Sequence, residues 1–65
     1  MDIESEKDNI KIHVDKGNYH AAINLAISAV NECRRNDDQK GVDEFLDVVK
    51  DIVQVMTDEF GSKPL

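Results

Sequence analysis

The chain has 65 residues, of which 14 are acidic and eight are basic, so its formal net charge is −6. A chain of this length forms one domain at most and has no room for a large enclosed active site beside a core. The acidic balance argues against nucleic acid as a partner, because binding phosphates requires clustered lysine and arginine. We expect one domain over residues 1–65, with flexible ends at 1–4 and 62–65.

The composition also indicates a compartment. The single cysteine, Cys33, cannot form an internal disulfide, which favours a reducing environment. The N-terminus is acidic and lacks the positive start and apolar stretch of a secretory signal. Apolar runs are only a few residues long, whereas a membrane helix needs about 20. The sequence therefore predicts a soluble, cytoplasmic protein without a membrane segment.

The first predicted helix covers about residues 5–16. Ser5 is the expected N-cap, because an acidic residue follows it at the spacing of a capping box, and Gly17 is expected to end the helix. Residues 10–14 also alternate between apolar and polar side chains, which is a strand pattern. A short strand stays open there as an alternative, although helix is preferred because a lone strand has nothing to pair with.

The second predicted helix covers about residues 19–35, and most of its circumference is apolar, as expected of a helix that packs on two sides. Its alanines allow a neighbouring helix to approach closely. A polar turn follows at residues 36–40, in which Asp37 or Asp38 can cap the next helix. The apolar residues of this second helix are Tyr19, Ala22, Ile23, Leu25, Ala26, Ile27, Ala29, Val30 and Cys33.

The third predicted helix runs to about Phe60 and is ended by Gly61. Val48 and Val55 lie beside its main apolar stripe, with Ile52 between them, and they make the apolar face wider than a narrow helix–helix seam requires. We expect this face to be buried against the first helix or a second copy of the chain, and we predict these three valine and isoleucine residues as the dimer interface. The main stripe consists of Val42, Phe45, Leu46, Val49, Ile52, Val53 and Met56.

The join between the first two helices resembles a known helical hairpin. Residues 17–30 are similar to the turn and second helix of a tetratricopeptide repeat, and also to the turn of MIT-type three-helix domains. The resemblance implies an antiparallel hairpin with the Tyr19 ring packed over it. The residues that match the repeat are Gly17, Tyr19, Ala22, Ile23 and Ala29.

A second, fainter resemblance concerns the last two helices together. Two antiparallel helices that end in Phe60-Gly61 and a polar tail are similar to Rop-type plasmid regulators. Those proteins dimerise into four-helix bundles and bind RNA through basic helix positions. Because the present helices are acidic, the resemblance implies the dimer rather than the RNA binding.

The sequence shows no constellation of catalytic residues. Cys33 lies on the apolar side of its helix and far from any histidine in sequence, which is typical of buried packing. His13 and His20 flank the turn at Gly17, but no third ligand follows at metal-like spacing. There is no glycine-rich phosphate loop. We therefore expect no enzymatic activity, no metal and no cofactor.

Three aspartates recur every four residues on the third predicted helix: Asp43, Asp47 and Asp51. Like charges at this spacing form a ridge and are mildly destabilising. The ridge is typical of a solvated helix face, and it is also a candidate docking surface for a basic protein, since complementary charge speeds encounter.

These patterns together predict an all-α fold: a small three-helix domain, with a short first helix and two longer antiparallel helices, that dimerises into a helical bundle. The expected function is that of a non-catalytic regulatory or adaptor domain, acting as a homodimer and binding an unknown, basic protein. Two alternatives stay open. One is an acidic inhibitor or immunity-type protein that neutralises a basic enzyme or toxin through the aspartate ridge. The other is a Rop-like RNA-binding regulator.

Overall fold

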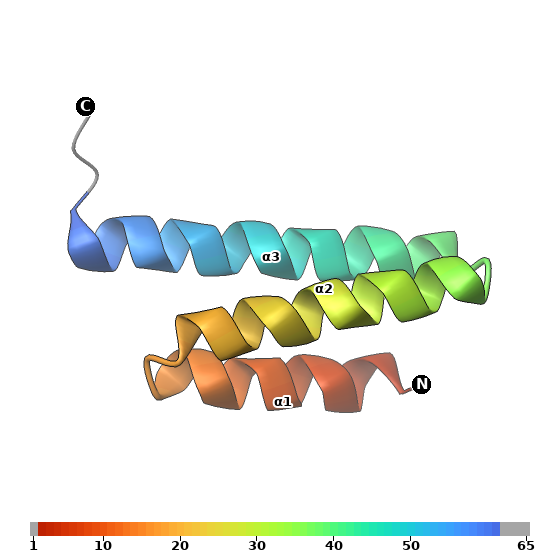
Figure 1. Cartoon of the computed structure of the whole chain (residues 1–65), viewed down its shortest axis with the longest axis horizontal. Coiled ribbons are helices and arrows are strands. Elements are labelled where there is room, and N and C mark those ends of the chain that lie inside the picture. The colour runs from red at the N-terminus through yellow and green to blue at the C-terminus, as the bar shows by residue number, and fades with distance from the viewer. Residues whose placement is uncertain (1, 62–65) are drawn as a thin grey trace.

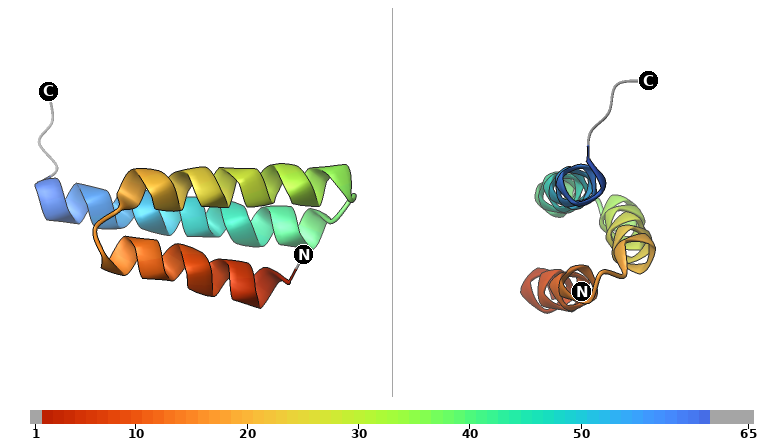
Figure 2. Two further views of the ribbon diagram at one scale, coloured as in Figure 1. Left: turned by 60° about the horizontal axis from the view of Figure 1, so that its bottom comes forward. Right: turned by 90° about the vertical axis from the view of Figure 1, so that its left-hand side faces the viewer.

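The computed structural model describes residues 2–61, which form three α-helices: α1 (Ile3–Asp15), α2 (Tyr19–Arg35) and α3 (Gln39–Phe60). The expected all-α fold is confirmed, and residues 10–14 are helical rather than a strand. Helix α2 runs antiparallel to both neighbours and packs against each, whereas α1 and α3 make few contacts with one another (Figures 1 and 2). Within the described residues, every helix is too short or too polar to span a lipid bilayer.

Helix α1 begins earlier than expected, because its N-cap is Asp2 rather than Ser5. The Asp2 carboxylate accepts hydrogen bonds from the N–H of Glu4 at 3.1 Å and from the hydroxyl of Ser5 at 2.9 Å. The hydroxyl and then the backbone of Ser5 hold the pKa of Asp2 below its usual value. An ionised carboxylate suits the positive end of a helix better than a hydroxyl does. Residues 3 and 4 of the expected flexible end thus lie within α1, while residues 1 and 62–65 lie outside the described part.

Both interhelical turns close the preceding helix with the hydrogen-bond pattern of a Schellman motif. After α1, the N–H groups of Gly17 and Asn18 donate to carbonyl oxygens of the last turn, each at 2.9 Å. After α2, the N–H groups of Asp37 and Asp38 donate in the same way, at 3.1 and 2.8 Å. The carboxylate of Asp38 then caps α3, as expected, by accepting from the N–H of Gly41 at 3.0 Å.

The two turns differ in the residue that adopts the left-handed conformation. It is Gly17 in the first turn, with φ of 79°, and Asp37 in the second, with φ of 54°. A side chain in this region costs roughly 1 kcal/mol relative to glycine, part of which is offset by the freedom of glycine in the unfolded chain. We expect Asp37→Gly to raise the free energy of unfolding in urea by about 0.5 kcal/mol, and Gly17→Ala to lower it by about 1 kcal/mol. A loss of stability in Asp37→Gly would contradict this account.

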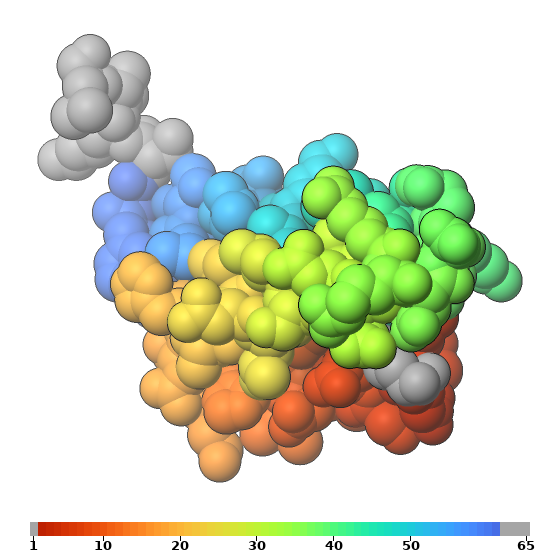
Figure 3. Space-filling model, turned by 45° about the vertical axis from the view of Figure 1, so that its right-hand side comes forward, coloured from red at the N-terminus to blue at the C-terminus, as the bar shows by residue number. Residues whose placement is uncertain are grey.

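The core consists of one cluster of buried side chains that all three helices supply. Helix α2 contributes mainly small residues, which let both neighbouring helices approach it, and the largest fully buried side chains are Phe45 and Ile10. On the face where α2 is nearest the viewer, the three helices form one continuous surface (Figure 3). The buried cluster comprises Ile10, Ala22, Ala26, Ala29, Val30, Cys33, Val42, Phe45 and Ile52.

Several large apolar side chains lie outside this core. Leu46 and Val53, expected in the packed stripe of the third helix, are 47% and 49% exposed, and Ile27 of α2 is 46% exposed. The prediction that these three residues are packed is wrong for the single chain. A helix buries only the parts of its surface that face its neighbours, and the apolar surfaces of α2 and α3 are wider than those parts.

Candidate functional site

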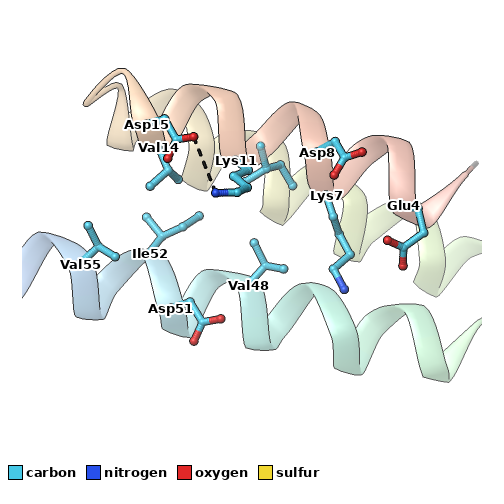
Figure 4. Close-up of a pocket in the computed structure, with 11 residues that line it drawn as sticks. Glu4, Lys7, Asp8, Lys11, Val14, Asp15, Val48, Asp51, Ile52 and Val55 are labelled. Carbon is cyan, nitrogen blue, oxygen red and sulfur yellow. Dashed lines mark ion pairs between the residues drawn. The ribbon is translucent and has the colours of Figure 1, made fainter.

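An open groove of about 430 Å³ lies between α1 and α3 (Figure 4). It exists because both helices pack against α2 and make few contacts with each other. Its apolar lining comes from both sides. Val14 of α1 points toward Ile52 and Val55 of α3 in Figure 4, and Ile10 adds a buried side chain at the base.

The predicted dimer residues all line this groove. Ile52 is buried, Val48 is half-buried, and Val55 is 38% exposed. The sequence analysis expected this face of α3 to be covered by the first helix or by a second copy of the chain. In the structure α1 covers part of the face, and the groove separates α1 from α3 along the rest. Contact of these three residues with a second copy stays a prediction.

Charged side chains border the opening on both helices. The ion pair of Lys11 and Asp15 spans 3.7 Å along α1, and both side chains are well exposed, so it adds little stability. Four carboxylates and two lysines line the groove, which gives its border a formal charge of −2. The border is therefore acidic above an apolar floor. Its charged residues are Glu4, Lys7, Asp8, Lys11, Asp15 and Asp51.

The three aspartates of the predicted ridge are all exposed, but they differ in their position relative to the groove. Asp51 lines the groove, but Asp43 and Asp47 do not, and both are exposed. Asp43 instead accepts a hydrogen bond from the side-chain amide of Gln39 at 3.0 Å. Residues four apart on a helix advance by about 40° around its axis, so the row turns away from the groove toward its N-terminal end. Only one of the three aspartates is brought to the groove.

The residues considered for chemistry lie apart from the groove. Cys33 is buried in the core, and burial, with smaller contributions from Asp38 and Glu32, raises the pKa of its thiol, so that it packs as a neutral group. The Nδ1 atom of His13 is buried without a hydrogen-bond partner, and His20 is exposed. Among residues 2–61, no group of three or more His, Cys, Asp or Glu side chains is placed to hold a metal ion.

Tyr19 has a structural contact that the sequence did not specify. Its ring meets the ring of Phe60 edge to face, with centroids 6.2 Å apart and planes at 84°. The contact joins the start of α2 to the end of α3, which are distant in sequence. Such a pair contributes about 0.5–1.5 kcal/mol beyond the burial of its surface.

The contribution of α1 to the groove is the part that the sequence analysis missed. The face of α1 toward the groove carries Lys7 and Lys11 beside Ile10 and Val14, at the three- and four-residue spacing of one helix side. This spacing in the sequence could have indicated that α1 lines the groove.

Comparison with protein-family models, with curated proteins and with solved structures finds no match. The tetratricopeptide, MIT and Rop resemblances therefore stay predictions.

Proposed function

We propose that this chain is a small, non-catalytic protein-interaction domain with a regulatory or adaptor role, which acts as a homodimer and holds a basic, amphipathic helix of a partner protein in the α1–α3 groove. The observation that carries the proposal is the open groove itself, which combines an apolar floor with an acidic border. A helix with one apolar and one charged face suits such a groove, because it buries the first face and keeps the second at the edges.

The dimensions of the groove support a short helical occupant. The lining residues on α1 run from Glu4 to Asp15, which corresponds to about 17 Å along the helix axis, or three turns. A partner segment of about 12 residues spans this length. Its apolar side chains at three- and four-residue spacing would rest on Val14, Val48 and Val55.

The charges support a basic occupant rather than an acidic one. Glu4 and Asp8 stand on one side of the opening and Asp51 on the other, in a chain whose formal net charge is −6. Lysine or arginine on the partner thus meets carboxylates at both edges, and the net charge steers the encounter at longer range. We expect the affinity to fall as salt is added.

A charge-reversal pair on α3 tests this use of the groove. The probe is a fluorescein-labelled helical peptide of about 14 residues, with leucine on one face and lysine on the other, and the readout is fluorescence anisotropy. Asp51→Lys is expected to raise the Kd at least about fivefold, because it places a cation at the groove edge. Asp47→Lys makes the same change of net charge on an exposed residue outside the groove, and is expected to change the Kd less than about twofold.

The outcome of this pair also decides among the alternatives. Equal weakening by Asp51→Lys and Asp47→Lys would show attraction to the whole acidic surface, which supports the inhibitor or immunity-type role through the aspartate ridge and contradicts the groove. No weakening by either variant would contradict both. A Rop-like role predicts a gel shift with structured RNA, and we expect none because the groove border is acidic.

A further inference from the structure

A second apolar surface lies on the other side of α3. Four of its large side chains are exposed: Ile27 by 46%, Leu46 by 47%, Val53 by 49% and Phe60 by 71%. None of the four lines the α1–α3 groove. We refer to the surface formed by these residues, Ile27, Leu46, Val53 and Phe60, as the α2–α3 seam.

The spacing along α3 is that of a helix-packing surface. Leu46, Val53 and Phe60 follow one another at intervals of seven residues, so they form a single row along the helix. The half-buried Val49 and Met56 stand between them and complete an alternating three- and four-residue pattern. This is the pattern with which one helix packs against another of similar length.

The position of Ile27 follows from a contact near the α2–α3 turn. There Arg34 of α2 lies beside Val42 of α3, around a small surface hollow. Ile27 precedes Arg34 by seven residues and so shares its side of α2, while Leu46 follows Val42 by four residues and shares its side of α3. Both side chains therefore belong to the same outer face of the hairpin.

The charges around the seam differ from those around the groove. The residues that border the seam lie three, four or seven positions from its members, on the outward side of each helix. They include the carboxylate of Asp43 and the basic side chains of Arg34 and Lys50, and the hollow beside Arg34 adds the carboxylates of Asp37 and Asp38, against four carboxylates and two lysines at the groove. The bordering residues given by this spacing are His20, Asn24, Asn31, Arg34, Gln39, Asp43, Lys50 and Thr57.

We propose that the α2–α3 seam is the surface through which two copies of this chain dimerise. Identical chains bring identical charges together, so in a protein with net charge −6 the less acidic of the two faces is the one that two copies share with less repulsion. The acidic border of the groove would oppose a second copy. This inference rests on the proposed homodimer. It places the dimer contact at the seam instead of at Val48, Ile52 and Val55, so that the groove stays open to the partner helix.

The size of the seam gives an estimate of the dimer's affinity. From Leu46 to Phe60 the row is about 21 Å long, and the face is two helices wide, which corresponds to the lower end of specific interfaces. The whole chain exposes 4726 Å² in the single copy, so an interface of about 500 Å² per copy would cover roughly a tenth of it. We therefore expect a dissociation constant in the micromolar range.

Sedimentation equilibrium over concentrations from about 1 to 500 μM tests the seam. The mass of the unmodified chain is expected to rise toward twice 7.3 kDa. The double variant Leu46→Gln with Val53→Gln removes two apolar contacts per copy without adding charge, and is expected to raise the Kd at least tenfold, by about 1.4 kcal/mol or more. Val55→Gln is the matched control, since it replaces an exposed aliphatic residue of α3 that lines the groove, and it is expected to leave the Kd within about twofold.

Two results would contradict the proposed dimer contact at the seam. One is a chain that stays monomeric over the whole concentration range, and the other is a dimer that Val55→Gln weakens and the double variant does not weaken. Circular dichroism confirms that each variant is helical, and Phe60→Gln, at the most exposed residue of the seam, gives a second variant if the double one unfolds. The leucine–lysine peptide is titrated into the same variants. Unchanged peptide affinity in a dimer-deficient variant separates a failure of the seam from a failure of the groove.

Discussion

Phe45→Ala is expected to lower the free energy of unfolding by about 3–5 kcal/mol, which is enough to unfold much of a domain of this size. Phe45 is 0% exposed and is the largest of the fully buried side chains. The surrounding core contains the alanines of α2, whose short side chains cannot reach into the space that the ring would vacate. The cavity therefore stays open, and its cost adds to the lost transfer free energy. Urea denaturation followed by circular dichroism measures the change.

Phe60→Ala is the matched control for this substitution. It removes the same ring from the same helix, but Phe60 is 71% exposed and its ring meets that of Tyr19. We expect a loss of about 1–2 kcal/mol when the measurement is made at a concentration where the chain is monomeric. Similar losses at the two positions would contradict the placement of Phe45 at the centre of the core.

The sequence was sufficient to predict three helices, because the apolar spacing is periodic and each turn carries its own signals. Gly17 and Gly61 stand where their helices end, and Asp38 caps α3. The start of α1 was predicted less well, since Asp2 and Ser5 are both good caps and lie within one turn of each other. The choice between them depends on hydrogen bonds that both residues share, which spacing alone does not rank.

The location of the groove could not be predicted for a different reason. Helix α3 carries several neighbouring apolar rows with the same seven-residue interval, among them Val48 with Val55, Phe45 with Ile52, and Leu46 with Val53. Periodicity shows that these three rows are apolar but not which of them α2 covers. The structure places the second row in the core, the first in the groove and the third on the outside.

The two uncovered rows are distinguished by their borders rather than by their apolar residues. Valine lines the groove beside carboxylates, whereas the seam combines leucine, isoleucine and valine with a less acidic border. The two occupants that we propose differ for this reason, since charge affects which partner approaches without repulsion. A dimer through the seam and a basic helix in the groove use opposite sides of α3, so the two are compatible within one assembly.

Gly41→Ala is expected to destabilise the protein by about 1–3 kcal/mol, although alanine is the better helix former. A β-carbon at Gly41 would lie 2.5 Å from the sulfur of Cys33 and 2.7 Å from a carboxylate oxygen of Asp38. Neither neighbour moves without cost. The thiol is buried in the core, and the Asp38 carboxylate accepts the hydrogen bond that caps α3. The absence of a side chain is what lets the ends of α2 and α3 meet closely.

A double-mutant cycle with Cys33→Ala tests which neighbour limits the space. Cys33→Ala alone removes one buried atom and is expected to cost about 1 kcal/mol. In the double variant the new methyl group of residue 41 occupies the volume that the sulfur leaves, so the combined loss should be smaller than the sum of the single losses by about 1–2 kcal/mol. Additive losses in urea denaturation would contradict the packing of Cys33 against Gly41. They would instead assign the strain to the Asp38 cap, because that carboxylate is the other group within 3 Å of the added carbon.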